Sequence, residues 1–532
     1  MKINKSKINI NNYEELEQQE NENDPINNSN TSTKRSGIEL RRKKGSRQKK
    51  INWLFIISVI LFIFCIIFIF IYLKIYFEQN LSYKNLKFYN NLNISQNSTE
   101  NDLTNLNISN NKTNTTGRIG VAFVYKHLFG NGIGRMLSLL CSQLAKLEKF
   151  DIYMITGGGY KLDFEFDERV IMVRIGSNKT LIQKYDETSN IKIYVLQNDL
   201  TPSSIKWYQN LNGGKKVIGI MHGVYMSSIF SNQTGVYSIW KYNQLFDAYV
   251  QNIADDYYVN KKLGINNSFF LPNLFTFEAD ETPSSELTYN NLMIMGRELD
   301  RIKGGKFGIK AMSLIVKEVP DAKLYFISAN YNINFLEDLI KELNLTENIE
   351  VIHYTQNISK YFLNSSILLC PSLSESYPMV MNEGKAHGLP IVAFNVSYSP
   401  PYQRGVIVCD ITNYTQMAEE SIKLLKDFNY RKKKAKEAKD SLSYFSNKET
   451  VEKWARLFEV LVNNDIEGYK KLQEYTFEKK YYDDESAREH LEYNWNKGKE
   501  YNPYFCCHNF EDMLNITYIN EIKPCKNQSL CQ

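Results

Sequence analysis

The sequence lacks the motifs on which several enzyme classes depend. Its 532 residues contain no Asp-x-Asp, no Gly-x4-Gly-Lys-Ser/Thr, no His-Glu-x-x-His and no Gly-x-Ser-x-Gly. These absences exclude a P-loop phosphate site, a zincin centre and a serine-hydrolase elbow, and nothing signals a metal-bridged nucleotide site. Cysteine is also scarce, because eight residues in a chain of this length cannot define a small disulfide-stapled fold.

The positive charge of the chain is confined to one end. The net charge is +5. Residues 1–50 hold 12 Lys and Arg against 7 Asp and Glu, so residues 51–532 carry no net charge. We therefore predict no nucleic-acid-binding face and interpret residues 1–50 as a disordered, basic cytoplasmic tail.

A long apolar run follows the basic segment. Trp53–Leu73 contains 21 residues without a charge, and a helix needs about 20 to span a bilayer. Nine cations lie within 34–50, whereas only three lysines follow closely, which predicts a cytoplasmic N-terminus. We expect a transmembrane signal anchor at 51–77, and a single-pass type II membrane protein of the Golgi or ER whose remaining residues are lumenal.

Both ends of the expected lumenal part have unusual compositions. Residues 78–116 contain 12 Asn and six Asn-x-Ser/Thr sequences, which predicts a flexible, glycosylated stalk. Residues 465–532 form a C-terminal extension with four cysteines and a histidine close together: Cys506, Cys507, Cys525, Cys531 and His508. Disulfides in an oxidising lumen are the preferred interpretation. A zinc site is the alternative, although adjacent cysteines lack the usual ligand spacing.

Strand and helix patterns alternate from Arg118 to Val462. Strands are expected at 119–125, 152–156, 169–175, 192–196, 216–221, 292–296, 323–328, 349–353, 366–370, 391–394 and 406–409. Helices are expected at 133–147, 305–317, 334–343, 379–387, 415–426 and 450–462. This alternation predicts an α/β fold with parallel sheets covered by helices. Its length predicts two doubly wound, Rossmann-like domains, 117–275 and 276–464, facing across a cleft.

The stretch from Cys370 to Ala393 carries the strongest chemical signal. A strand ends at Cys370, a turn contains Glu375, and Pro378 fits the first turn of a helix that carries Glu383. Gly388 and Pro390 end this helix. A helix N-terminus is an anion site, so we expect the backbone of Ser376, Tyr377, Pro378 and Met379 to face a ligand. The two carboxylates can accept hydrogen bonds from hydroxyl groups.

Three further sites are expected at strand ends. Arg297 and Lys303 follow the strand at 292–296 and can neutralise a diphosphate. The segment Phe129–Arg135 holds Gly132 and Gly134 between the first strand and its helix; it permits close approach of a ligand but departs from the dinucleotide pattern because position 135 is Arg. His222 ends an N-terminal strand. A solvated basic loop, a tight turn and a structural histidine are the respective alternatives.

These motifs resemble the retaining glycosyltransferases of family 4, which have the GT-B fold. The resemblance rests on Arg297, Lys303, Glu375-x7-Glu383 and Gly388-Leu-Pro390, and spans about residues 118–462. It implies that Arg297 and Lys303 bind the donor diphosphate, that Glu375 contacts the donor sugar and Glu383 the ribose, and that His222 lies near the transferred sugar. It also implies that no metal or other cofactor is required, and that the helix at 450–462 packs back across the domains.

The resemblance thus assigns the acceptor to 117–275 and the nucleotide sugar to 276–464. The expected reaction is transfer of a hexosyl group from a UDP- or GDP-sugar to a glycan, glycoprotein or glycolipid in the secretory lumen. The main alternative is a non-catalytic GT-B-like membrane protein that binds glycans or serves as a scaffold. A cytosol-facing transferase acting on lipid precursors is a third possibility, disfavoured by the flanking charges. The chain departs from the family at Pro378, where glycine is usual.

Overall fold

The computed structural model describes most of the chain that follows the expected stalk. The described residues are 117–126, 128, 132–157, 164–197, 201–222, 241–296, 303–328, 334–353, 355, 357–373, 375, 377–396, 405–444, 446–475, 484–501, 510–511 and 514. The predicted tail at 1–50, anchor at 51–77 and stalk at 78–116 lie outside them. Among the residues in these ranges, no helix has the length and apolar character of a membrane span.

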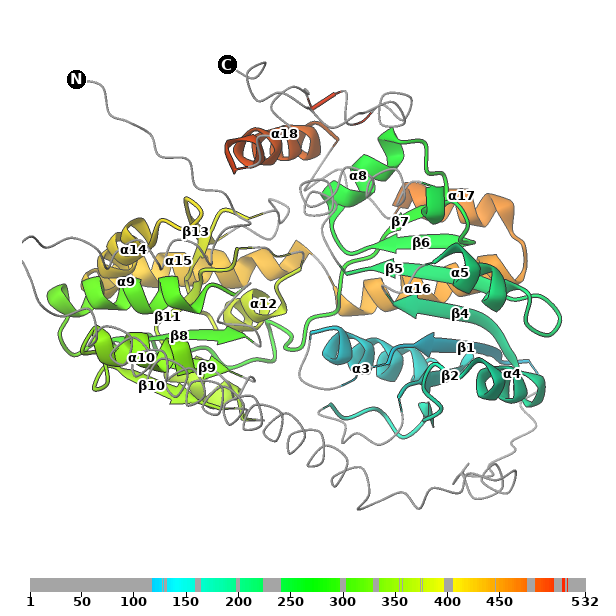
Figure 1. The fold of residues 1–532 in the computed structure, drawn as a ribbon, viewed down its shortest axis with the longest axis horizontal. Coiled ribbons are helices and arrows are strands. Elements are labelled where there is room, and N and C mark those ends of the chain that lie inside the picture. Colours follow the sequence, from blue (N-terminus) through cyan, green and yellow to red (C-terminus); the bar gives the residue numbers. More distant parts are fainter. Residues whose placement is uncertain are drawn as a thin grey trace, which may run out of the picture. The chain divides into compact units, whose positions relative to one another are not determined.

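The first sheet in the described part has seven parallel strands in the order β3-β2-β1-β4-β5-β6-β7 (Figure 1). These strands are β1 (Ile119–Val124), β2 (Phe150–Ile155), β3 (Ile171–Val173), β4 (Ile191–Gln197), β5 (Lys216–Met221), β6 (Ala248–Gln251) and β7 (Ser268–Phe270). β1, β2, β4 and β5 are mainly apolar and mostly buried, whereas only Val173 of β3 is buried. All five agree with the predicted strands to within two residues. The helices described beside it are α3 (Gly132–Ala145), α4 (Lys179–Thr188), α5 (Pro202–Gln209) and α8 (Ala254–Lys262).

The second sheet has six described strands, also parallel, in the order β10-β9-β8-β11-β12-β13. Its strands are β8 (Asn291–Gly296), β9 (Lys323–Ser328), β10 (Ile349–Ile352), β11 (Ile367–Cys370), β12 (Ile391–Phe394) and β13 (Val406–Cys409). Its helices are α9 (Gly305–Glu318), α10 (Asn334–Glu342), α11 (Ser359–Leu363), α12 (Met379–Ala386), α14 (Tyr414–Lys426) and α15 (Phe428–Asp440), followed by the 3-10 turn η1 (Ser441–Tyr444). The connection 271–290 between the sheets contains no strand or helix. The expectation of two parallel α/β sheets is confirmed.

The chain returns from the second sheet to the first through α16 (Asn447–Val462). Trp454 and Phe458 of this helix are buried in the core of the first sheet, where the Phe458 ring lies 5.5 Å from Phe150 and 6.4 Å from Phe123. Asn447 donates to the carbonyl of Phe275 and accepts from its amide, which ties the start of α16 to the connection between the sheets. The predicted return of this helix across the domains is confirmed.

The described helices of the C-terminal extension also pack on other parts of the chain. α17 (Ile466–Tyr475) covers the edge strand β7, because Gln473 donates to the carbonyl of Ser268. α18 (Asp484–Tyr501) lies against α8 through the buried hydrogen bond between His490 and Asp255 (Figure 1). These contacts give the extension a structural role. Its four cysteines and His508 lie outside the described residues.

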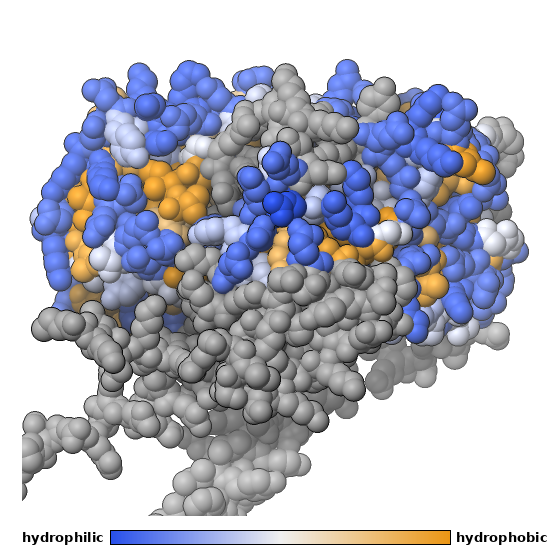
Figure 2. Space-filling view, turned by 90° about the horizontal axis from the view of Figure 1, so that it is seen from above, coloured by the Kyte–Doolittle hydropathy of each residue, from blue (hydrophilic) through white to orange (hydrophobic). Residues whose placement is uncertain are grey.

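The cores of the two sheets are apolar and their outer surface is mixed. Cys141, Cys370 and Cys409 are buried, unpaired members of these cores, and burial raises the pKa of each thiol. Figure 2 shows mainly hydrophilic side chains on the described surface, interrupted by apolar patches. Large exposed apolar residues come from separate elements: Ile171, Tyr289, Phe335, Phe428, Ile466 and Tyr493.

Candidate active site

Lys303 and Glu375 meet at the carboxyl edge of the second sheet. Lys303 lies in the connection that follows β8, and Glu375 follows β11, the strand paired with β8 in parallel. The Lys303 ammonium forms an ion pair with Glu375 Oε1, which also accepts a hydrogen bond from Ser372 Oγ at 2.8 Å. The Glu375 side chain is 10% exposed and that of Lys303 is 27% exposed. The structure therefore brings together two residues that were predicted to share a site.

Gly304 makes this approach possible. Its φ is 62°, in the left-handed region, and it precedes α9 as the N-cap. A Cβ on Gly304 would lie 2.0 Å from the carbonyl oxygen of Pro371, which is a forbidden contact. Glycine is thus required for the backbone that carries Lys303 to reach the loop that carries Glu375.

Glu383 is held by α12, whose ends follow from its sequence. Pro378 is the N-cap, one position before the helical place expected for it, and its φ of −73° suits that turn. At the other end Gly388 has a φ of 68°, and the amides of Gly388 and Leu389 donate to the carbonyls of Lys385 and Gly384. This is the Schellman arrangement expected of a glycine C-cap. The expected helix at 379–387 and its glycine C-cap are confirmed, whereas Pro378 precedes the helix and does not lie in its first turn.

The carboxylate of Glu383 is buried and partly satisfied. Its side chain is 1% exposed. Oε1 accepts from the guanidinium of Arg135, with which it forms an ion pair, and from Thr276 Oγ1 at 2.9 Å. Oε2 is buried and has no hydrogen-bond partner among the described residues. A buried anionic oxygen of this kind is costly unless a donor reaches it, so it is a candidate contact for a ligand.

The described part of the predicted glycine segment, residues 132–135, lies in the first turn of α3. Gly132 begins the helix, and the Met379 sulfur lies 3.9 Å from the position that a Gly132 Cβ would occupy. A Cβ on Gly134 would lie 3.0 Å from the carbonyl of Leu128 and 3.1 Å from Phe164. Gly134 therefore accommodates neighbouring parts of its own chain, whereas Gly132 faces the start of α12.

His222 follows β5 and has partners on both ring nitrogens. Its Nε2–H donates to Gln197 Oε1 at 2.6 Å, and Asn252 Nδ2 donates to Nδ1 at 3.3 Å. Burial lowers the pKa of His222 to about 3, so the ring is neutral at physiological pH. His222 can orient a neighbouring group by hydrogen bonding, but it supplies no positive charge.

The remaining predicted residues divide into two groups. The ring of Tyr377 belongs to the core of the second sheet, and its hydroxyl donates to the carbonyl of Asn273 at 3.0 Å; burial raises its pKa. Its side chain therefore anchors α12 to the connection between the sheets, and only its backbone is left to face a ligand. Arg297 and Ser376 lie outside the described residues.

A family comparison covers all six described strands of the second sheet. Residues 278–441 match the family model described as glycosyl transferases group 1. These residues form a glycosyltransferase group 1 domain. The domain contains Lys303, Glu375 and Glu383, whereas Arg135, Thr276 and His222 lie outside the matched range.

Two curated relatives match short stretches of the chain. An uncharacterised glycosyltransferase of Haemophilus influenzae is 29% identical over 134 residues, which are 24% of this chain and 38% of that protein. A poly(glycerol-phosphate) alpha-glucosyltransferase of Bacillus subtilis is 24% identical over 169 residues, or 30% of this chain and 25% of that protein. The chain thus spans well under half of either relative.

Solved structures extend the likeness to both sheets. Sucrose-phosphate synthase of Thermosynechococcus elongatus has a TM-score of 0.55 and 12% identity, covering 65% of this chain and all of that one. An S. aureus TarM variant in complex with fondaparinux, α-GlcNAc-glycerol and UDP has a TM-score of 0.51 and 13% identity, covering 64% and 99%. At these identities the likeness shows the fold alone, which is GT-B.

Arg135 and Thr276 are site residues that sequence reasoning missed. Arg135 was noted only as a departure from a glycine pattern, and Thr276 was placed next to a predicted domain boundary. The one available signal was a cation in the first turn of a helix after a glycine segment. Such a cation is unfavourable near the positive end of the helix dipole and therefore needs a compensating anion.

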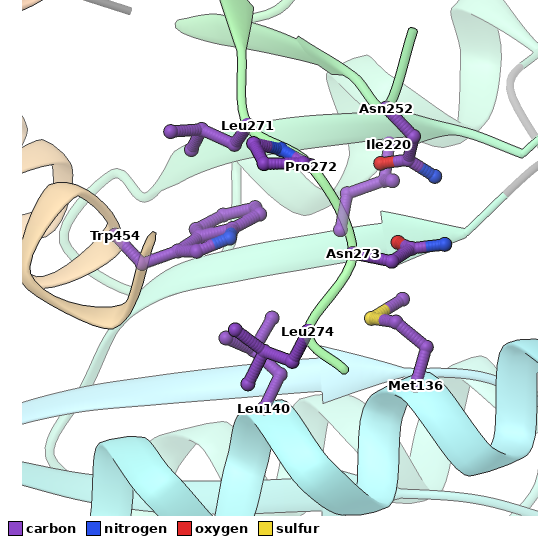
Figure 3. A pocket seen from close by; sticks show the side chains of 9 residues that line it. All are labelled: Met136, Leu140, Ile220, Asn252, Leu271, Pro272, Asn273, Leu274 and Trp454. Atoms are coloured by element: carbon purple, nitrogen blue, oxygen red, sulfur yellow. The ribbon is translucent and has the colours of Figure 1, made fainter. Parts of the chain in front are cut away.

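A pocket beside this site belongs to the N-terminal core. Met136 and Leu140 of α3, Trp454 of α16 and the connection from Leu271 to Leu274 line it, together with Ile220 and Asn252 (Figure 3). It has no room for a water molecule. We therefore interpret it as imperfect packing where α16 meets the connection, and assign it no ligand of the glycosyltransferase domain.

Proposed function

We propose that this protein is a metal-independent, retaining glycosyltransferase that moves a hexosyl group from a UDP- or GDP-sugar to a glycan, glycoprotein or glycolipid. The observation that carries the proposal is the pairing of Lys303 with Glu375 at adjacent strand ends of a glycosyltransferase group 1 domain. The UDP complex of TarM and the glucosyltransferase name of the B. subtilis relative support a nucleotide-sugar donor.

The charges of the site fit the departure of a nucleoside diphosphate. When the bond between the anomeric carbon and the phosphate oxygen breaks, negative charge develops on the diphosphate. Lys303 and Arg297 provide the positive charge that a metal ion supplies in other enzymes. Glu375 keeps Lys303 in place and can accept a hydrogen bond from a sugar hydroxyl. Glu383 accepts hydrogen bonds from the hydroxyls of the ribose.

The acceptor completes the reaction from the side of the first sheet. Its hydroxyl oxygen bonds to the anomeric carbon on the face that the diphosphate leaves, so the configuration is retained. The hydroxyl proton passes to the departing phosphate oxygen, and no protein nucleophile is needed. Gly132 and the neutral His222 are the residues we propose to face this acceptor.

The membrane part of the proposal rests on the sequence. The cations of residues 34–50 and the run at 53–73 predict a lumenal catalytic part, and the Asn-x-Ser/Thr sequences of the stalk provide a test. Endoglycosidase treatment of the full-length protein from a eukaryotic host should increase its electrophoretic mobility. A host-expressed protein that carries no glycan would contradict the lumenal placement.

Sugar transfer is tested with the full-length chain in detergent micelles. Nucleotide sugars are supplied with EDTA, and release of nucleoside diphosphate is measured. Lys303→Ala should lower turnover by about 10²- to 10³-fold, as does loss of a group that stabilises developing charge. The matched control is Lys426→Ala, because Lys426 forms an exposed ion pair with Glu318 on the same domain. It should leave turnover unchanged.

Each other outcome has a defined meaning. A protein that binds nucleotide sugars without turning any over would support the scaffold alternative. Activity that disappears with EDTA and returns with a divalent cation would contradict metal independence. A Lys303→Ala variant as active as the Lys426→Ala control would remove the role proposed for the Lys303–Glu375 pair.

A further inference from the structure

An ion pair joins the helix after β1 to the donor-side helix of the glycosyltransferase domain. Arg135 lies in the first turn of α3, and Glu383 lies in α12, 248 residues further along the chain. The Arg135 guanidinium also lies over the Phe164 ring, 5.5 Å from its centre, and its side chain is 29% exposed. Aromatic packing therefore restricts the guanidinium while it faces the carboxylate.

The hydrogen bonds of Glu383 divide its two oxygens into different roles. A carboxylate oxygen has two lone pairs. Oε1 uses both, one for Arg135 and one for Thr276. Both lone pairs of Oε2 lack a partner in the described part of the chain. The free oxygen thus matches a ligand that brings two adjacent hydroxyls, as a ribose does.

We propose that Arg135 is a positioning residue for the donor: it fixes Oε1 of Glu383 so that Oε2 alone receives the ribose hydroxyls. This inference rests on the proposed function. Because Oε2 is shielded from solvent, the donor must displace the atoms that cover it. Without a fixed Oε1 the carboxylate would turn during that step and share its oxygens between protein and ligand. The donor site is thereby completed by a residue outside the group 1 domain.

The charge of Arg135 also matters for the bound state. A carboxylate that is 1% exposed is costly to keep ionised without a nearby cation. Hydrogen bonds to an ionised group are stronger than those to a neutral one. Arg135 therefore strengthens the contacts that Oε2 makes with hydroxyls without touching the ligand.

Nucleotide binding to the full-length chain tests the proposal. Dissociation constants are measured for UDP and GDP and for their 2′-deoxy forms, in wild type, Arg135→Gln, Thr276→Val and Arg135→Lys. Arg135→Gln should lower the affinity for the preferred nucleotide about tenfold. It should also reduce the ratio by which the protein prefers that nucleotide over its 2′-deoxy form. Arg135→Lys should recover part of both effects, and Thr276→Val should cause a smaller loss without removing a charge.

The matched control is Arg169→Gln. Arg169 forms an exposed ion pair with Asp167 in the same part of the chain, so this variant should bind as the wild type does. A double variant, Arg135→Gln with Glu383→Gln, separates positioning from direct contact. If Arg135 acts through Glu383, the double variant binds no more weakly than Glu383→Gln alone.

The possible results separate the two proposals. Wild-type affinity and 2′-hydroxyl preference in Arg135→Gln would overturn the positioning role while leaving the proposed function intact. Fully additive losses in the double variant would also overturn it, because Arg135 would then contact the ligand itself. Failure of the wild-type protein to bind either nucleotide would overturn the proposed function, and the positioning role with it.

Discussion

Gly304 offers a sharp test of how the backbone sets the charges of the site. In Gly304→Ala the new Cβ would lie 2.0 Å from the carbonyl oxygen of Pro371, whereas real Cβ contacts are essentially never under 3.0 Å. The backbone φ of 62° adds strain, because residues with a Cβ disfavour the left-handed region. The substitution therefore combines a conformational penalty with a collision between two backbone segments.

The two penalties have different sizes and different consequences. Left-handed backbone costs about 1–2 kcal/mol for a residue with a Cβ. Relief of the collision requires the loop before α9 to withdraw by about 1 Å, which is the difference between the two contact distances. Lys303 moves with that loop and leaves Glu375. A misplacement of this size near a reacting centre lowers the rate by about 10²-fold.

Gly264→Ala is the matched control for the strain alone. Gly264 has a φ of 72°, and nothing lies within 4 Å of its Cβ position. In urea titrations Gly264→Ala should lose about 1–2 kcal/mol of unfolding free energy, and Gly304→Ala should lose more, because the collision with Pro371 adds to the strain. Only Gly304→Ala should also lose sugar-transfer activity and nucleotide affinity. Equal stability in the two variants, with wild-type turnover in Gly304→Ala, would refute the reasoning.

Two other changes test burial. Because the pKa of His222 falls to about 3 from its ordinary 6.5, the unfolded chain binds a proton below pH 6.5 that the folded chain does not. This contribution to stability is complete at neutral pH and declines as the pH falls. Between pH 6.5 and 5 the loss of unfolding free energy is about 2 kcal/mol. In urea titrations the stability of His222→Gln should therefore depend less on pH than that of the wild type. The same pH dependence in both proteins would contradict the burial of His222. Trp495→Ala in α18 removes a fully buried indole and should lower the unfolding free energy by about 3–5 kcal/mol, whereas Ile466→Ala, at a side chain 71% exposed, should change it by less than about 0.5 kcal/mol.

The sequence predicted strands well where burial is local and continuous. β1 and β5 are short apolar runs buried along most of their length, as strands covered on both faces should be. β6 and β7 were missed because β6 is the short segment Ala-Tyr-Val-Gln and β7 has three residues. Their burial arises from pairing with β5 and with each other, which no local pattern reveals.

Several helices were also missed, among them the highly charged α15. α15 has the sequence Phe-Asn-Tyr-Arg-Lys-Lys-Lys-Ala-Lys-Glu-Ala-Lys-Asp, and its buried residues are Arg431, Ala435 and Ala438. Small residues and one arginine give almost no apolar periodicity. Arg431 is accommodated because it donates to the carbonyls of Leu424 and Leu425 at the end of α14. The stability of such a helix comes from contacts that form only after the chain folds.

The same distinction separates the predicted site residues from the missed ones. Lys303 and Glu375 follow strands, and Glu383 lies in α12, the helix after the second of them. All three belong to one domain, so strand order alone places them at one edge. Thr276 and Arg135 reach Glu383 from 107 and 248 residues away. Their roles depend on how the first sheet meets the second. The cation in the first turn of α3 signals that Arg135 needs an anion, but a single sequence does not say which anion it meets.

This meeting of the sheets has two kinds of contact with different responses to a ligand. Asn447 with Phe275, and Tyr377 with Asn273, are hydrogen bonds between a side chain and the backbone. Their strength does not depend on charge in the site. The Arg135–Glu383 contact is an ion pair at the proposed ribose position, so hydroxyls or phosphates that arrive there alter its electrostatic environment directly. A bound donor can therefore alter the Arg135–Glu383 contact between the sheets while the uncharged hydrogen bonds of Asn447 and Tyr377 remain. Glu383 thus takes part both in donor binding and in the contact between the two domains.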